Sequence, residues 1–207
     1  MVNIALVGCN GKMGKAVTSA VQSRNDCEIV FGADPFGTPA YDYPVFESLA
    51  VSDKKADVII DFSNPASLDD ILAYALEKKI PCVLCTTGYS PEQVEKIKKA
   101  SESVAVFYSG NMSLGINLLI ELSKEAAKIL GAADFDIEIV EKHHNQKIDA
   151  PSGTALMIAD GISDTLAEEP QYVYDRHSYR KKRSKNEIGI HSVRGGTIVG
   201  EHEGIFS

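Results

Sequence analysis

Basic side chains that could do chemistry gather in one short segment, where His143, His144 and Lys147 lie within five positions. One histidine can transfer a proton near neutral pH while the other holds an anion, and the lysine can bind a carboxylate or help to protonate a developing carbanion. Neighbours on an extended chain point to opposite sides, so the two histidines are poorly placed to chelate one metal ion. We therefore expect acid–base chemistry on an anionic substrate and no metal site.

A predicted helix start follows this basic cluster directly. Ser152 has the side chain of an N-cap, which leaves the N–H groups of Gly153 and Thr154 pointing out of the helix end. A carboxylate is stabilised at such a terminus by the helix dipole. An ordinary N-cap would explain Ser152 but not the basic residues before it. We expect the two features to form one anion-binding site.

A glycine-rich turn links the first predicted strand to the first predicted helix. Its G-x-x-G-x-x-G spacing is related to the dinucleotide-binding fingerprint, in which glycines let the backbone approach a pyrophosphate at a helix N-terminus. A purely structural turn is the alternative, but the strand–turn–helix context favours a cofactor site. The residues are Gly8, Cys9, Asn10, Gly11, Lys12, Met13 and Gly14.

The acidic residue that this fingerprint expects at the end of the second strand is Asp34. Its carboxylate suits hydrogen bonding to the ribose hydroxyls of NAD. Pro35 follows it instead of an arginine or lysine, so no neighbouring cation awaits the 2′-phosphate of NADP. Lys12 could supply part of that charge. The sequence favours NADH and leaves dual use with NADPH open.

Two further loops follow predicted parallel strands at their carboxyl ends, where such sheets bind ligands. Small and hydroxyl side chains there suit a nicotinamide ring or its ribose, although position alone fits ordinary loops equally well. The candidate cofactor residues in these loops are Cys85, Thr86, Thr87, Ser109, Gly110, Asn111 and Met112.

The hydrophobic pattern predicts the scaffold. Apolar strands alternate with helices in the first half, which is typical of an α/β fold with a Rossmann-like doubly wound parallel sheet. An α+β substrate-binding and oligomerisation domain follows, and we divide the domains as 1–112 and 113–207. The expected strands are 2–7, 28–33, 58–61, 82–85, 104–107, 136–141, 187–193 and 197–203; the expected helices are 12–23, 66–78, 91–101, 116–130 and 153–166; residues 37–44 are an expected loop.

The overall charge restricts the partners. A net charge of −8 argues against general nucleic-acid binding and against an anionic membrane surface. No apolar run approaches the roughly 20 residues of a membrane span, and the apolar N-terminus leads straight into the glycine turn, so we interpret it as a strand and not a signal peptide. The four cysteines are then expected to be reduced thiols in the cytoplasm.

Two other motifs receive structural interpretations. Cys82 and Cys85 form a C-x-x-C pair, but they lie three apart in an apolar strand and no second Cys or His pair completes a zinc site. The basic stretch 176–185 stands out in an acidic chain, and we interpret it as a solvated, mobile loop. Contact with a phosphate or an acidic partner is the alternative.

Taken together, these motifs resemble the 4-hydroxy-tetrahydrodipicolinate reductase family, also called dihydrodipicolinate reductase. The resemblance runs in order through GCNGKMG, DFSNP, TTGY, GNMSLG, EKHHNQKIDAPSGTA and IGIHSVRGGTIVGEHE. The segment HHNQKIDAPSGTA is the most specific of these. Family members usually continue some tens of residues beyond GEHE, with a further strand and a returning helix, so we expect this chain to lack that tail.

The resemblance implies hydride transfer from NADH or NADPH to a small cyclic imine dicarboxylate in lysine and diaminopimelate biosynthesis. It implies a homotetramer built through the second domain. His143 matches the proton donor and Lys147 the second catalytic residue, while the cofactor contacts match residues 8–14, Asp34, Thr86, Thr87 and Asn111. The substrate contacts match His144, Ser152, Gly153 and Thr154, with a weaker indication for Arg194.

Two alternatives stay open at this point. The first is another nicotinamide enzyme of the same architecture, although common sugar oxidoreductases carry Glu-Lys-Pro after the fifth strand and this chain has Gly110, Asn111 and Met112. The second is a non-catalytic NAD-binding sensor, which would not need His143 and Lys147.

Overall fold

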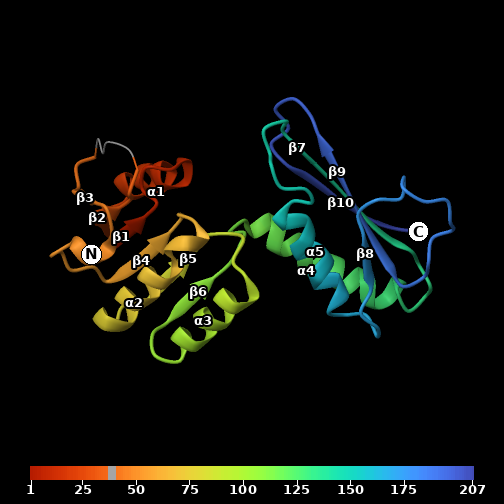
Figure 1. Cartoon of the computed structure of the whole chain (residues 1–207), viewed down its shortest axis with the longest axis horizontal. Coiled ribbons are helices and arrows are strands. Elements are labelled where there is room, and N and C mark those ends of the chain that lie inside the picture. Colours follow the sequence, from red (N-terminus) through yellow and green to blue (C-terminus); the bar gives the residue numbers. More distant parts are fainter. Residues whose placement is uncertain (37–40) are drawn as a thin grey trace. The chain divides into compact units, whose positions relative to one another are not determined.

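The chain forms two compact units, Met1–Gly110 and Asn111–Ser207 (Figure 1). This computed structural model describes residues 1–36 and 41–207, so part of the expected loop 37–44 lies outside the described residues. No helix in the described ranges is long and apolar enough to cross a membrane. The first unit contains β1 (Val2–Val7), α1 (Lys12–Gln22), β2 (Cys27–Ala33), β3 (Val45–Phe46), β4 (Val58–Asp61), α2 (Leu68–Lys78), β5 (Cys82–Leu84), α3 (Pro91–Ser101) and β6 (Val106–Tyr108).

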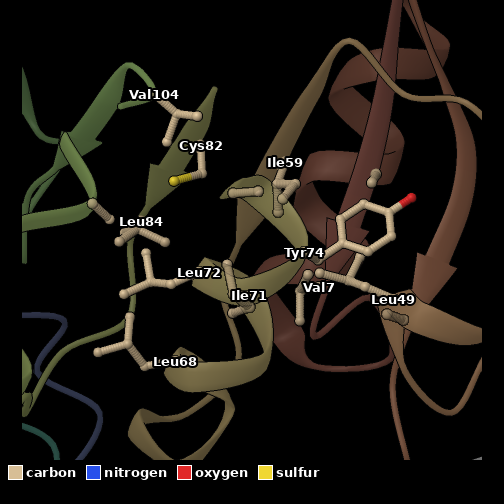
Figure 2. Packing of buried hydrophobic residues seen from close by; sticks show 14 of the residues in the cluster. Val7, Leu49, Ile59, Leu68, Ile71, Leu72, Tyr74, Cys82, Leu84 and Val104 are labelled. Atoms are coloured by element: carbon tan, nitrogen blue, oxygen red, sulfur yellow. The ribbon is translucent and has the colours of Figure 1, made fainter. Parts of the chain in front are cut away.

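The sheet of the first unit is parallel throughout, in the order β3-β2-β1-β4-β5-β6. Side chains of β1 alternate between two cores: Ala5 and Val7 pack with α2 and α3 (Figure 2), and Ile4 and Leu6 pack on the side of α1. Burying such side chains stabilises a fold by about 1.5–3 kcal/mol each. The predicted doubly wound sheet is confirmed.

Three details of the first unit differ from the prediction. The two-residue strand β3 is too short to leave a pattern in the sequence. Helix α2 begins at Leu68 and not at residue 66, because Asn64 accepts a hydrogen bond from the amide of Ala66 and caps a 3₁₀ turn. Strand β6 begins two residues late, because the amide of Val104 donates to Ala100 and closes the end of α3.

The second unit pairs two helices with a mixed sheet. Its elements are α4 (Leu114–Leu130), β7 (Ile137–His143), α5 (Gly153–Ser163), β8 (Gln171–Val173), β9 (Glu187–Arg194) and β10 (Glu201–Phe206). The sheet order is β10-β7-β9-β8, in which only β10 runs antiparallel to its neighbour. The chain joins β9 to β10 directly, yet the two do not pair, because β7 lies between them.

One face of this sheet packs on the helices. Ile137 and Ile139 of β7 share a buried cluster with Ala155 and Ile158 of α5 and with Ile188 of β9. Along β7, buried residues alternate with half-buried ones, as the one-sided pattern of the sequence predicts. The same inward face continues to Glu141 and His143, so the strand carries two polar side chains to the edge of a hydrophobic core.

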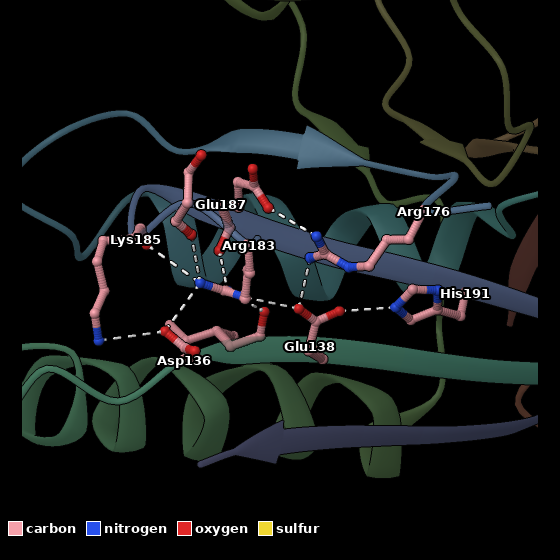
Figure 3. A network of polar contacts seen from close by, with 9 residues as sticks. Asp136, Glu138, Arg176, Arg183, Lys185, Glu187 and His191 are labelled. Carbon is pink, nitrogen blue, oxygen red and sulfur yellow. Dashed lines mark hydrogen bonds and ion pairs between the residues drawn. The ribbon is translucent and has the colours of Figure 1, made fainter. Parts of the chain in front are cut away.

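The opposite face of the sheet holds an ionic network that includes Arg176 and Arg183, so the interpretation of residues 176–185 as a solvated loop is wrong for these two arginines (Figure 3). The Glu138 carboxylate is bound by Arg176 at 2.7 Å, by Arg183 at 2.9 Å and by His191 at 2.7 Å. Arg183 also donates to the carbonyl oxygens of Ile137 and Glu187. The two arginines therefore clamp the segment onto the sheet; the residues between them, 177–182, are exposed apart from the half-buried Tyr179.

We expect the Arg183→Met variant to lower the free energy of unfolding by about 1–3 kcal/mol, because it removes the donor from several part-buried acceptors, including the carbonyls of Ile137 and Glu187. Urea unfolding followed by circular dichroism measures this. Lys182→Met is the matched control: Lys182 is exposed, and its loss should change stability by less than about 0.5 kcal/mol. Equal stabilities for the two variants would contradict the importance of the clamp.

Candidate functional site

The turn after β1 is packed too closely for side chains at two of its glycines. Gly8 has φ +76°, and a Cβ there would lie 2.5 Å from the carbonyl oxygen of Phe62. A Cβ on Gly14 would collide with the backbone of Gly8 and Cys9. Gly11 is the N-cap of α1 and makes no side-chain cap. No side chain therefore caps the first amides of α1, and such a helix N-terminus suits a pyrophosphate.

Asp34 is held rigidly beside this turn. Its Oδ2 accepts the amide of Asn10 at 3.0 Å, and its Oδ1 accepts the amide of Phe36 at 2.9 Å. A pocket of about 550 Å³ opens here, lined by Gly8, Gly11 and Asp34 among others. The carboxyl ends of β1, β2 and β4 meet at this place, where the strand order reverses and such sheets bind dinucleotides.

Sequence reasoning missed the part of this pocket that follows β4. Ser63 and Asn64 line it together with Asp34. The loop is shaped by the buried Asp61, whose Oδ1 accepts the amide of Ser63 at 3.0 Å. The sequence did indicate this loop, because Ser63 and Asn64 directly follow an apolar strand, as do the predicted cofactor loops 85–87 and 109–112.

The loops after β5 and β6 contain one polar group that suits a ligand. Thr86 is buried, and its hydroxyl has no hydrogen-bond partner in the described part of the chain. Thr87 is exposed, whereas Cys85 is buried, and burial raises the pKa of its thiol to about 11. The amide of Ser109 donates to the carbonyl of Leu84 at 3.1 Å and continues the β5–β6 pairing into the loop.

The remaining predicted cofactor residues have different surroundings. Lys12 and Met13 are exposed at the start of α1, while Cys9 is buried, and burial raises its pKa to about 11. Gly110 ends the first unit and is half-buried; Met112 is exposed. Asn111 begins the second unit, where its side-chain amide donates to the Thr154 hydroxyl at 3.0 Å. Asn111 therefore lies beside a predicted substrate residue.

His143 ends β7 on the inward face of the sheet and is 9% exposed. Its Nδ1 lies 2.6 Å from the carboxylate of Glu141. Its ring packs edge-on against that of His202, with centroids 5.2 Å apart. Burial, followed by the neighbouring charge of His143, lowers the pKa of His202. Two histidines thus meet here, but the second is His202 of β10; His144 lies half-buried on the chain beyond β7.

Lys147 and the start of α5 lie around the carboxylate of Asp149. The Lys147 ammonium lies 2.8 Å from the Asp149 carboxylate. Burial opposes ionisation of Asp149, but hydrogen bonds from Lys147 and from the backbone, including that of Gly153, lower its pKa. A carboxylate is therefore already stabilised at this place, beside a helix terminus with open space over Gly153.

Ser152 makes its hydrogen bonds within the second unit. Its hydroxyl accepts the amide of Ala155 at 3.2 Å, which confirms the N-cap, and its own amide donates to Glu141. The hydroxyl also lies 3.2 Å from His202 Nε2. Gly153 and Thr154 are more accessible than Ser152, which is 1% exposed. Sequence reasoning missed Glu141 and His202, although Glu141 shares the face of Ile137 and Ile139 in an alternating strand.

Comparison with known proteins identifies the family. The family model for the N-terminus of dihydrodipicolinate reductase matches residues 2–112, and the model for its C-terminus matches residues 115–207. The chain belongs to the dihydrodipicolinate reductase family. The 4-hydroxy-tetrahydrodipicolinate reductase of Clostridium tetani is 53% identical over the whole chain, which covers 80% of that relative. The corresponding enzyme of Caldanaerobacter subterraneus is 51% identical, with 81% of it covered.

A solved member of the dihydrodipicolinate reductase family has the same fold. The dipicolinate-bound enzyme from Paenisporosarcina sp. TG-14 superposes with a TM-score of 0.77 at 26% identity, covering all of this chain and 83% of that one. The WlbA dehydrogenase of Chromobacterium violaceum, at 15% identity, shares the fold alone, with a TM-score of 0.61 over 93% of this chain and 67% of that one.

Proposed function

We propose that this protein reduces the dehydrated form of 4-hydroxy-tetrahydrodipicolinate to tetrahydrodipicolinate, a step of lysine and diaminopimelate biosynthesis. The observation that carries the proposal is the environment of His143 and Lys147: a buried histidine on a carboxylate, and a lysine beside a helix terminus that already stabilises a carboxylate. A cyclic dicarboxylate needs both a proton donor and cationic partners. Family membership of the whole chain gives independent support.

Residues 1–112 are proposed to bind a nicotinamide dinucleotide, which supplies the hydride when bound. The fit rests on the close-packed glycine turn, on the start of α1, which no side chain caps, and on the buried Thr86 hydroxyl, for which the described residues supply no hydrogen-bond partner. Asp34 would accept the ribose hydroxyls of NADH, and its charge would repel a 2′-phosphate. We propose NADH as the preferred cofactor, with Lys12 permitting some use of NADPH. The other residues of 8–14 and the loops 85–87 and 109–112 complete the proposed cofactor site.

Residues 113–207 are proposed to bind the substrate. Lys147 would exchange Asp149 for a substrate carboxylate, and the amides of Gly153 and Thr154 would hold the same group at the start of α5. His144 and the Ser152 segment would border it. The reduction adds one hydride and one proton, and His143 would donate the proton from Nε2 and recover it from water.

The test is a coupled assay. The protein is mixed with the synthase product of pyruvate and aspartate semialdehyde, and oxidation of NADH and of NADPH is followed separately. We expect turnover with both and a higher kcat/KM for NADH. Absence of turnover with either cofactor, in a sample that binds NADH, would contradict the proposed reaction; a clear preference for NADPH would contradict only the role given to Asp34.

We further propose that the protein is a cytoplasmic homotetramer assembled through residues 113–207. Support comes from the family resemblance and from apolar side chains exposed on this unit, including Leu118 and Leu122 of α4 and Ile205 of β10. Sedimentation velocity gives the mass of the assembly directly, and a monomer at micromolar concentration would contradict this proposal.

A further inference from the structure

Glu141 is a fully buried carboxylate directly behind His143. It is 0% exposed, on the face of β7 that packs against α5. A buried charge is unfavourable unless it is paired and hydrogen-bonded. Such a group would not stand at the end of a hydrophobic core unless several partners stabilised it.

Both oxygens of Glu141 are occupied by donors from three elements. Oε1 accepts Arg194 Nη2 at 2.7 Å and the amide of Ser152 at 3.1 Å. Oε2 accepts Arg194 Nη1 at 2.7 Å and lies 2.6 Å from His143 Nδ1. Burial opposes ionisation, but these hydrogen bonds, with one from Ser192, hold the pKa of Glu141 down to about 2. The carboxylate is therefore ionised at neutral pH and has no room for a substrate.

An ionised partner at Nδ1 selects the state of the His143 ring. A carboxylate accepts only, so Nδ1 carries a hydrogen and Nε2 is the atom left for proton exchange. The Nε2 atom faces Gly200, where a Cβ would lie 3.0 Å from it and where φ is +153°. The Nε2 atom thus borders a position that has no side chain.

Arg194 serves this arrangement and is a poor substrate ligand. Its two terminal nitrogens both bind Glu141, and they also donate to the carbonyls of Val193 and Asp149. The contact with Asp149 connects Arg194 to the loop that carries Lys147. These contacts favour a role for Arg194 in holding the Glu141 carboxylate over the direct binding of substrate.

We propose that Glu141, fixed by Arg194, is the positioning residue of the proton donor: it orients the ring of His143 and stabilises its protonated form so that Nε2 delivers the proton. The inference rests on the proposed role of His143 in the reduction. The other titratable groups around the pair are His202 on β10 and Lys147 and Asp149 on the loop before α5. None of these touches Nδ1 in the described chain, so orientation depends on Glu141.

The first test is Glu141→Gln, which keeps the shape and removes the charge. We expect kcat to fall by about 10²-fold with KM changed less than about threefold, since the wrong ring tautomer is then favoured. The high-pH limb of the kcat profile should move to lower pH, because the imidazolium has lost its counter-charge. A purely structural role would not move this limb.

The matched control is Glu138→Gln, on the same strand but the opposite face, in the network with Arg176 and Arg183. It should lose stability and keep kcat and its pH profile. If wild-type protein is active and His143→Ala is not, while Glu141→Gln keeps the wild-type rate and profile, the inference is overturned and the proposed function stands. Inactive wild-type protein would instead remove the proposed function.

A second variant covers the case in which Glu141→Gln does not fold. Arg194→Lys keeps a positive charge but cannot grip the carboxylate with two nitrogens. We expect kcat to fall about tenfold at nearly constant substrate KM. A rise in KM of tenfold or more at unchanged kcat would show that Arg194 binds substrate directly and would overturn the inference.

Discussion

His143→Ala and Lys147→Ala are each expected to lower kcat by a factor on the order of 10²–10⁴ and to leave NADH affinity nearly unchanged. His143 is the buried histidine with a carboxylate on Nδ1, and Lys147 is the cation at the start of α5. In the proposed mechanism, removing His143 takes away the proton donor, whereas removing Lys147 takes away the partner of a substrate carboxylate. Lys147→Ala should therefore also raise the substrate KM. Steady-state kinetics and NADH fluorescence titration measure these quantities.

Lys142→Ala is the matched control for Lys147→Ala. Lys142 precedes His143 on β7, points to the other face of the sheet and pairs with the exposed Glu201 at 3.2 Å. We expect its loss to change kcat by less than about twofold, since an exposed ion pair contributes little. Full activity in both His143→Ala and Lys147→Ala would refute the proposed mechanism, whereas NADH binding without turnover by the unaltered chain would favour an NAD-binding sensor.

Gly8→Ala is expected to have the largest effect on the first unit. An alanine at φ +76° is strained by roughly 1–2 kcal/mol, and its Cβ would press on the carbonyl of Phe62 at 2.5 Å. The turn can relieve this contact only by moving away from β4. We expect a loss of several kcal/mol in the free energy of unfolding and a rise in the NADH dissociation constant of more than tenfold.

Gly11→Ala lies in the same turn and separates backbone strain from general sensitivity. Gly11 has φ −70°, and its Cβ would come no closer than 3.3 Å to the carbonyl of Gly8. The free energy of unfolding of Gly11→Ala should stay within about 1 kcal/mol of the wild-type value, because a change from Gly to Ala at an N-cap affects little beyond the cap. Equal unfolding curves for Gly8→Ala, Gly11→Ala and the unaltered chain would contradict the close packing of the turn.

The first unit is largely predictable from sequence because its strands are apolar runs that end at glycine or polar residues. The prediction errs where local hydrogen bonds decide the end of a helix or strand, as at Asn64 before α2 and at Val104 after α3. The second unit is less predictable. Strand β10 begins at Glu201 and not at residue 197, because the amide of Gly195 pairs with His143 and the chain turns through Gly200. Hydrophobic periodicity predicts a strand, but it does not predict which strand pairs with it.

The candidate site is also predictable only in part from the sequence. The types of His143, Lys147 and the residues of the glycine turn indicate chemistry without a structure. Contacts across the sheet do not appear in the sequence: His202 reaches His143 from β10, and Arg194 reaches Glu141 from β9. The basic residues Arg176 and Arg183 are misjudged for the same reason, because their acidic partner Glu138 is 38 and 45 positions away.

Because Arg176 and Arg183 both bind Glu138, the loop between these two arginines can change in length without disturbing the sheet. Arg176 and Arg183 hold both ends of segment 177–182, so its ends stay in place whatever the residues between them do. The entropy of closing a flexible loop rises slowly, by about 0.6 kcal/mol for each doubling in length. This segment can therefore accept inserted residues at little cost, and an epitope or a fluorophore attached there is expected to leave strand β7, which carries His143, undisturbed.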